Sequence, residues 1–356
     1  MARKQTNMIK YIIKRIIMMI PMLLAVLIVC FILSQMMVAD PFMNRLNAQM
    51  DPEDFRRELE RLGAYDPLHI KIAKYLVRLF TGDWGESYVV MPGTPVLSMI
   101  GKIWPKTIEL MIIPIILSPL IAVKLGVLSA KHQNKGKDIM VRLIAILGAG
   151  FPIFFIAWVL QVIFFYLGVY TYGEFSIPLL YSNSLHYIGY YPAPDGAFRT
   201  GFRIIDAILY NDQIYLWDTL IHLSLPVMAM LLSSLAPITR QTRSSMLDVM
   251  DQDYIRTARA KGVPDRKVLN KHALRNALIP TSNLIIGGTA EALVGSFFVE
   301  VSFNYTGLGY YMVQAIFNGD YYVIQGILVF STIIILIGTL TADVMYTIID
   351  PRITYS

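Results

Sequence analysis

The chain has 356 residues, of which 55% are hydrophobic and 16% are charged, and 31 Lys and Arg outnumber 25 Asp and Glu. A soluble domain is about 45–50% apolar and about 25% charged, so this composition excludes an ordinary soluble fold. In a membrane protein, a net charge of +6 is typical of basic cytoplasmic loops and not of nucleic-acid binding.

Six apolar runs are long enough to cross a bilayer as helices of ~20 residues. They are expected at 9–36, 107–130, 139–166, 217–238, 280–299 and 322–349. The first run is longer than the ~7–15 apolar residues of a signal peptide, which favours a retained anchor. Prolines at 114, 119, 226 and 237 predict kinked helices within a bundle. The single cysteine, Cys30, excludes an internal disulfide and a Cys-rich metal site.

Lys and Arg residues set the expected orientation of these spans. The N-terminus, the loop 131–142 and the segment 240–275 are basic and alternate correctly with the six spans. By the positive-inside rule, both termini are predicted to be cytoplasmic. The segments 37–106, 168–216 and 300–321 are then external.

The external segments contain their own structural signals. Asp51 suits a helix N-cap, Pro52 suits the first helical position, and Gly63 can end that helix. A second amphipathic helix follows, and its apolar face consists of Leu68, Ile72, Tyr75, Leu76 and Leu79. Both helices either lie on the membrane or bundle surface or dock a partner. The tyrosines of 168–216 are more typical of interfacial anchors than of ligand contacts.

The stretch DYIRTARAKGVPDRKVLNKHALRNALIP, at 253–280, interrupts the apolar runs with an ordered basic pattern. Asp253 can cap a short helix, Gly262 permits a turn with positive φ, and Pro264 suits the start of a second helix. The next apolar face consists of Val268, Leu269, Ala273 and Ala277. The pattern therefore predicts a helix, a glycine turn and a second helix at the cytoplasmic surface.

Three interpretations of this stretch are open from the residues alone. It is a basic loop that sets topology, a nucleic-acid helix-turn-helix, or a rigid docking element for a cytoplasmic partner. The nucleic-acid interpretation is disfavoured because both ends are tied to membrane helices.

The same stretch resembles the cytoplasmic loop of binding-protein-dependent ABC importer permeases, where a Glu-Ala-Ala signature precedes a glycine at fixed spacing. Here Arg256, Thr257 and Ala258 stand in place of that signature, and Gly262 stands at the glycine. DYIRTARAKG followed by KHALRNALIP is similar to the version in the oligopeptide, dipeptide and nickel subfamily. The segments at 62–88, 297–326 and 343–353 also resemble its B-type permease subunit, in the same order.

The resemblance implies an all-α, six-span ABC type I importer permease with an external helical insertion after the first helix. We expect an N-terminal cytoplasmic segment with the first span at 1–36, the external helical segment at 37–106, a five-helix core at 107–349 and a cytoplasmic tail at 350–356. The coupling loop then covers 239–279. The residues implied to couple to an ATPase are Asp253, Tyr254, Arg256, Thr257, Ala258, Arg259, Lys261 and Gly262.

The implied partners are a second homologous permease in a heterodimer, two cytoplasmic ATPase subunits and an extracytoplasmic peptide-binding protein. The implied location is a bacterial cell membrane, and the implied substrate is an oligopeptide or dipeptide. Nickel or another small solute is the alternative within the family. Outside it, an ATP-independent channel or secondary transporter remains, and so does a membrane enzyme.

Catalytic motifs are missing from the sequence. It contains no G-x-x-x-x-G-K-[ST], H-E-x-x-H or G-x-S-x-G pattern, so we expect no ATP binding, no enzyme activity, no cofactor and no metal.

Ionisable residues within spans are costly and often functional. Candidates for the translocation path are Glu291, Glu300 and His222. The alternatives are a buried, partnered Glu291 and a His222 that is a metal ligand or a hydrogen-bonded histidine at a helix end. Glu109 is expected at an interface, Lys124 can snorkel toward the cytoplasm, and Asp343 is expected as a structural partner.

Overall fold

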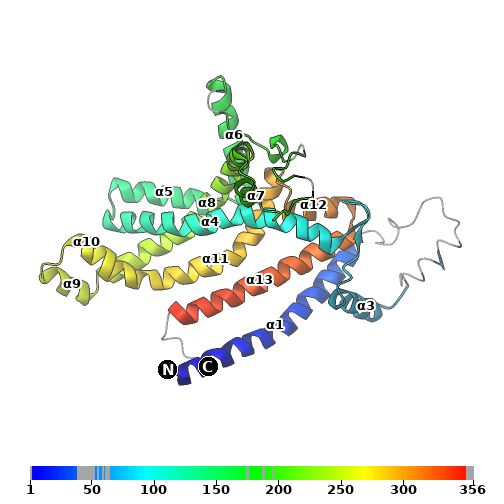
Figure 1. Cartoon of the computed structure of the whole chain (residues 1–356). Helices are drawn as coiled ribbons and strands as arrows, with labels where there is room; N and C mark the ends of the chain where they lie inside the picture. The colour runs from blue at the N-terminus through cyan, green and yellow to red at the C-terminus, as the bar shows by residue number, and fades with distance from the viewer. Residues whose placement is uncertain are drawn as a thin grey trace.

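The computed structural model describes residues 2–37, 65–173, 176–186, 189–194 and 196–349, together with isolated positions between 53 and 60 (Figure 1). This part of the chain is mainly helical, and in its one short hairpin β1 (Glu86–Ser87) pairs antiparallel with β2 (Thr94–Pro95). The helices are α1 (Ala2–Met37), α3 (Leu68–Phe80), α4 (Val96–Lys131), α5 (Gly136–Gly150), α6 (Ile153–Tyr170), α7 (Arg203–Leu209), α8 (Gln213–Met250), α9 (Asp253–Ala260), α10 (Asp265–Lys267), α11 (Leu274–Ser302), α12 (Leu308–Asn318) and α13 (Tyr321–Ile349). A 3₁₀ turn, η2 (Tyr181–Asn183), and a π-helix, η3 (Val268–Ala273), complete them.

The chain is a multi-pass membrane protein with an all-α fold. Within the described residues, α1, α4, α6, α8 and α13 are long and apolar enough to cross a bilayer. A sixth span results if the bent pair 265–289 and 291–302, which meets at 50°, counts as one crossing. The predicted fold class is therefore confirmed.

The long helices form a bundle whose centre is α8. Helix α8 packs along α4, α5 and α11, whereas α1 packs along α13 (Figure 1). The main core lies between α4, α6, α8 and α11 and includes the fully buried Leu110, Leu225 and Ala229. Large apolar side chains such as Ile116 and Leu120 remain exposed on the outer side of α4, as expected for contact with lipid.

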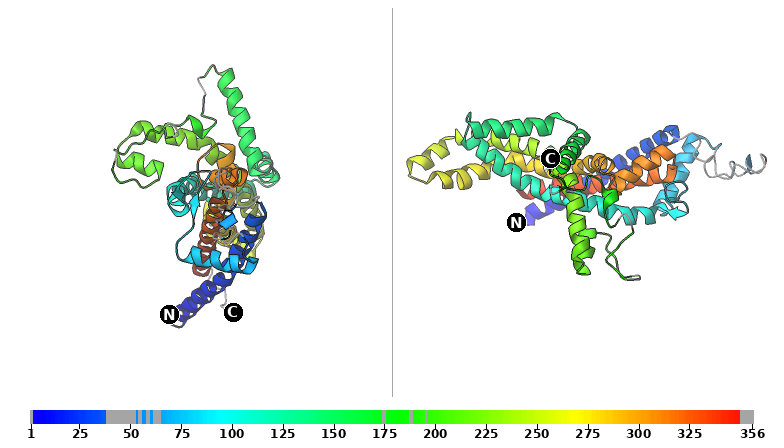
Figure 2. Two further views of the ribbon diagram at one scale, coloured as in Figure 1. Left: turned by 90° about the vertical axis from the view of Figure 1, so that its right-hand side faces the viewer. Right: turned by 90° about the horizontal axis from the view of Figure 1, so that it is seen from above.

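The prediction of a single third span at 139–166 is wrong. The structure divides this run into α5 and α6, because Phe151 and Pro152 both adopt extended backbone angles. A residue that precedes proline is disfavoured in the α conformation, and proline cannot donate a helical hydrogen bond. Helix α6 consequently leaves the bundle at a steep angle, as Figure 1 and the left view of Figure 2 show.

The two ends of the bundle differ in what they carry. One end carries α9, α10, the α4–α5 turn, the N-terminal part of α1 and the C-terminal part of α13 (Figure 1). The other end carries α3, the hairpin and α12. Near the first end, Arg15 of α1 forms an ion pair of 2.5 Å with Asp343 of α13. Asp343 is therefore the structural partner that the sequence predicted.

Of the two amphipathic helices expected after α1, the one at 51–63 falls almost wholly outside the described residues. The second is confirmed as α3, where Ile72 and Tyr75 pack against a core cluster and Leu68 stays exposed. The Tyr75 ring lies 4.8 Å from that of Phe31, between centroids, which attaches α3 to α1.

Asp320, at the start of α13, holds the hairpin against the bundle. Its carboxylate accepts hydrogen bonds from Ser87 Oγ at 2.6 Å and from the amides of Val89 and Val90 at 3.0 Å each. The hydroxyl of Tyr88 donates to the Gly319 carbonyl at 2.6 Å.

Candidate functional site

The basic stretch folds as a short helix, a glycine turn and a second helical segment, as predicted. Gly262 has a φ of 75°, and its amide donates to the Arg259 carbonyl at 2.9 Å. The next amide, of Val263, donates to the Ala258 carbonyl at 3.2 Å, which closes the C-terminus of α9. One detail differs: Gln252 occupies the N-cap and Asp253 is the first helical residue, so Asp253 does not cap the helix.

A small hydrophobic cluster fixes this element to the bundle. Ile255 of α9 is fully buried with Val268 and Ala273 of η3, and Met246 of α8 and Ala130 of α4 join the same cluster. Leu269 and Ala277 also belong to it, so the predicted apolar face is confirmed. The element is therefore a rigid continuation of α8 and α11 and not a loose linker.

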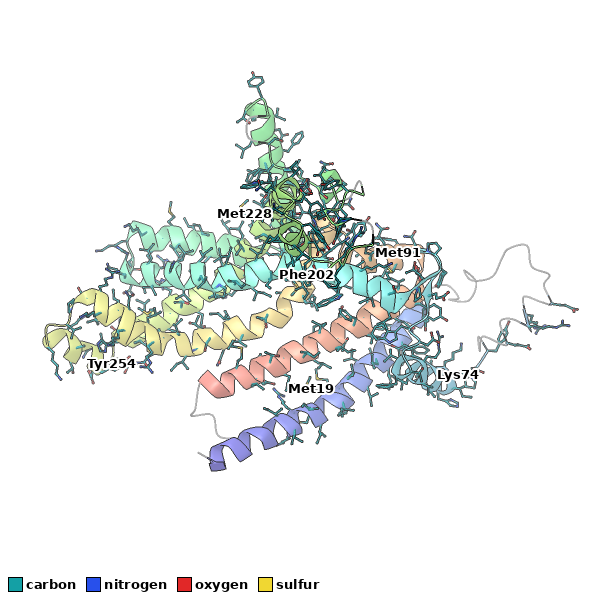
Figure 3. All side chains as sticks on the ribbon, viewed as in Figure 1. Met19, Lys74, Met91, Phe202, Met228 and Tyr254 are labelled. Atoms are coloured by element: carbon teal, nitrogen blue, oxygen red, sulfur yellow. The ribbon has the colours of Figure 1, made fainter. Side chains whose placement is uncertain are left out.

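The other face of α9 is exposed and basic. Tyr254 projects from the end of the molecule (Figure 3) and is 43% exposed, and Arg256, Thr257, Arg259 and Lys261 are exposed as well. Ala258 alone among the predicted coupling residues is half-buried, against the chain's own cluster.

The ion pairs on this face are weak. Arg256 lies 3.4 Å from Asp253 and Arg259 lies 3.7 Å from Asp265. Exposed pairs of this kind contribute little, so these cations remain available to a partner.

A buried ionic link, which the sequence did not predict, lies beside this element. The Asp138 side chain is fully buried at the α4–α5 turn and accepts two hydrogen bonds from the Arg243 guanidinium of α8, at 2.8 and 2.9 Å. It also accepts from the Asn134 amide at 2.8 Å and from the Ser129 hydroxyl. The hydrogen bonds from Arg243 hold the pKa of Asp138 well below its usual range.

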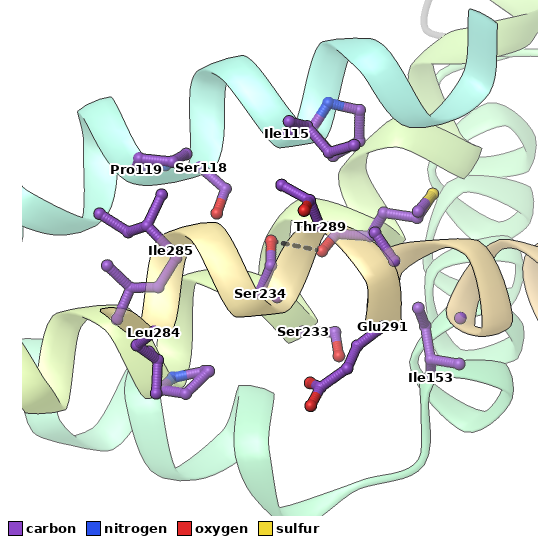
Figure 4. A pocket seen from close by; sticks show the side chains of 17 residues that line it. Ile115, Ser118, Pro119, Ile153, Ser233, Ser234, Leu284, Ile285, Thr289 and Glu291 are labelled. Carbon is purple, nitrogen blue, oxygen red and sulfur yellow. Dashed lines mark hydrogen bonds between the residues drawn. The ribbon is translucent and has the colours of Figure 1, made fainter. Parts of the chain in front are cut away.

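Farther along the bundle, α4, α6, α8 and α11 line a partly open cavity of about 310 Å³. Glu291 lines it together with Ser118, Ser233, Ser234 and Thr289, and Figure 4 shows the Glu291 carboxylate beside Ser233. The remaining walls are mostly apolar. The bend in α11 lies beside Glu291, so the residue stands where the helix changes direction.

The other two predicted path residues lie outside this cavity. Glu300 is fully buried near the end of α11, where its carboxylate accepts from the amides of Gly309 and Tyr310 at 2.7 and 3.2 Å and so caps α12. His222 is buried in α8, with its Nδ1 2.7 Å from the Asp218 carbonyl oxygen. Within the described residues, no group of three or more His, Cys, Asp or Glu residues is placed to bind a metal ion.

A second buried polar cluster lies between the 168–216 segment and the bundle. The Arg203 side chain is 1% exposed, lies 4.7 Å above the Tyr181 ring and 6.0 Å from that of Tyr215, and donates to the Thr219 hydroxyl at 3.2 Å. Tyr181 and Tyr215 are therefore packing residues, which corrects the expectation of interfacial tyrosines for these two, whereas Tyr170 and Tyr172 are exposed.

The expectation for Glu109 is also wrong. Its carboxylate is buried and accepts from the Ile204 amide at 2.6 Å, so it does not face an interface. Lys124, by contrast, is exposed on α4.

Comparison with known proteins agrees with this arrangement. The family model described as "Binding-protein-dependent transport system inner membrane component" matches residues 122–355, and its N-terminal companion matches residues 8–110. The oligopeptide transport system permease AppB of Bacillus subtilis is 35% identical over 98% of this chain and all of the relative.

Two further relatives cover nearly the full length. The dipeptide permease DppB of Alkalihalophilus pseudofirmus is 35% identical over 98% of this chain and all of its own. The di/tripeptide permease DppB of Pseudomonas aeruginosa is 31% identical, over 98% of this chain and 99% of its own. The chain thus belongs to the family of binding-protein-dependent transport system inner membrane components.

Proposed function

We propose that this chain is the membrane permease subunit of an ATP-driven importer of oligopeptides or dipeptides. The full-length relatives are oligopeptide, dipeptide and di/tripeptide transport permeases, which supports peptide transport. The observation that carries the proposal for this chain is the rigid, outward-facing basic element at 253–262. A surface of exposed cations with a fixed backbone suits docking into an acidic cleft, whereas a flexible loop would lose force in bending.

In this proposal, α9 and the Gly262 turn contact one of two ATPase subunits, and both chain termini lie on the same cytoplasmic side. Tyr254, Arg256, Thr257, Arg259 and Lys261 form the contact face, Asp253 starts the helix, and Ala258 holds it against the cluster. Closure of the ATPases pushes α9, and the buried cluster passes the displacement to α8 and α11. These two helices line the cavity, so the push reaches the site where substrate passes.

The same proposal assigns a second homologous permease to the apolar sides of α5 and α6. Large side chains such as Met140, Ile146 and Trp158 are 59–66% exposed there, and α6 stands away from the bundle (Figure 2). A peptide-binding protein then delivers substrate at the end that carries α3, the hairpin and α12. The assembly belongs in a bacterial cell membrane, and the ATPase subunits hydrolyse the ATP.

The test is purification of the tagged full chain from its host in mild detergent, with mass spectrometry of the retained proteins. The wild-type chain is compared with Gly262→Pro, because proline has a φ near −65° and no amide to donate. The expected result is that the wild type retains two ATPases and a second permease, and that Gly262→Pro loses the ATPases but keeps the permease.

The control variant is Gly93→Pro at the opposite end. Gly93 also has a φ of 75° and an amide that donates to a carbonyl at 2.9 Å, so the backbone damage is matched. We expect Gly93→Pro to retain the ATPases. If the wild-type chain purifies without ATPases, an ATP-independent channel or carrier replaces the importer.

A further inference from the structure

The cavity between α4, α6, α8 and α11 has an unbalanced charge. Among the described residues that line it, Glu291 has the one ionisable side chain, and no Lys, Arg or His accompanies it. Within the described part of the chain, no ion pair or hydrogen bond to the Glu291 side chain is formed. The Glu291 side chain is exposed, so its charge is open to a ligand and is not balanced by a group of the described chain. A cation that enters the cavity would supply the missing charge.

Two helices that line the cavity also have carbonyls that lack their regular helical donor. Pro119 and Pro237 line it, and each removes the amide that would bond to the carbonyl four residues earlier in a regular helix. Those carbonyls belong to Ile115 and Ser233, which are both lining residues. Two helices thus have an acceptor without its regular partner at the same cavity.

The hydroxyl groups add to this pattern. Ser234 and Thr289 already donate to the carbonyls of Met230 and Ile286, at 2.8 and 2.7 Å. Ser118 and Ser233 make no side-chain hydrogen bond within the described residues, so their oxygens are free to accept. The Glu291 carboxylate and the Ser233 hydroxyl beside it (Figure 4) match a primary ammonium group, which carries one positive charge and three N–H donors.

We propose that Glu291, with the hydroxyl of Ser233 beside it (Figure 4), forms a subsite for the ammonium group of the peptide's free amino terminus. This subsite rests on the proposed peptide transport and specifies which end of the peptide enters it. None of the described residues that line the cavity has a cationic or amide side chain, so the proposal places the peptide's carboxylate elsewhere. A lysine of the companion permease offers the same ammonium chemistry, and the experiment separates these two sources.

The probes are radiolabelled trialanine and N-acetyl-trialanine. Each is bound at equilibrium to the complete complex of permeases and ATPases in lipid nanodiscs, without the binding protein, with and without nucleotide. Omitting the binding protein removes its own preference from the measurement. The variants are Glu291→Gln, Glu291→Asp and the control Glu86→Gln, which makes the same change on the exposed hairpin.

We expect the wild type and Glu86→Gln to bind trialanine about tenfold more tightly than its acetylated form, the ratio expected for one charge-assisted hydrogen bond. Glu291→Gln should abolish this ratio, and Glu291→Asp should retain part of it. Retention of the ratio by Glu291→Gln, or equal or undetectable binding of the two peptides to the wild type, would overturn the subsite.

A partner lysine would give a different result. Glu291→Gln would then release the companion permease from the tagged chain, while the ratio between the two peptides would not depend on residue 291. That outcome also overturns the subsite. Failure of the proposed function is distinct from all of these, because the wild-type complex would then contain no ATPases.

Discussion

The substitution Asp138→Asn tests the buried link between the α4–α5 turn and α8. Asparagine keeps the shape and one acceptor oxygen but removes the charge that faces Arg243. The Arg243 side chain is only 19% exposed, so its cation would remain in a largely dry site without its counter-ion.

Breaking a buried pair costs about 3–5 kcal/mol, and the retained acceptor places Asp138→Asn near the lower end, at about 3 kcal/mol. The assay is equilibrium unfolding of the purified chain in mixed micelles with increasing dodecyl sulfate, followed by tryptophan fluorescence. The pKa of Asp138 is lower in the folded protein than in the unfolded chain, where it is roughly 3.9. The stability that Asp138 contributes is therefore fully present above roughly pH 3.9, the unfolded pKa, and is lost only as pH falls through the folded pKa. The loss caused by Asp138→Asn should therefore be constant between about pH 5 and 8.

The matched control is Asp83→Asn, which breaks a pair with Arg78 at the same 2.8 Å but with side chains that are 59% and 39% exposed. An exposed pair is worth about 0–1 kcal/mol, so the control should change little. The double variant Asp138→Asn/Arg243→Met should recover part of the loss, because it removes the stranded charge. Equal effects of Asp138→Asn and Asp83→Asn would refute the view that burial makes this link strong.

Two further predictions concern the 168–216 segment. Burial, helped by the charges of Lys106 and Arg203, lowers the pKa of His186 to about 3, so the folded protein holds this histidine neutral. Stability should fall as pH drops from about 6.5 toward 3, since the unfolded chain gains the proton first, and His186→Asn should reduce this slope in a fluorescence unfolding series. Arg203→Met should loosen the segment, because Arg203 contacts Tyr181, Tyr215 and Thr219 together. The rate of amide hydrogen exchange at 203–209 should then rise by more than tenfold. An unchanged rate would show that the tyrosines alone hold the segment in place.

The positions of the spans were predictable because long apolar runs have few alternatives in a membrane. The start of α4 was missed by eleven residues, since Lys102 and Lys106 break the apolar run there. A signal existed: Val96, Met99, Ile100 and Ile103 repeat at helical spacing and are buried. Pro152 likewise marked the break between α5 and α6, which hydropathy alone does not detect.

The candidate site likewise has parts that the sequence predicts and parts that it does not. The coupling element is local in sequence, so its glycine turn and apolar face could be predicted from 253–280. The ion pair between Asp138 and Arg243 joins residues 105 positions apart, and no local sequence pattern predicts it. The cavity depends on how four helices meet, which composition and spacing do not determine.

Asp320 determines when, during synthesis, the hairpin can reach its final structure. The hairpin at 86–95 emerges early in synthesis, yet the carboxylate that organises it belongs to residue 320. Until α13 is inserted, Ser87, Val89 and Val90 have no acceptor from this residue, so the hairpin end of the bundle is completed late in synthesis. Chains that stop before Asp320 therefore leave this end incomplete, and a partner that docks on the hairpin would distinguish them from chains that include α13.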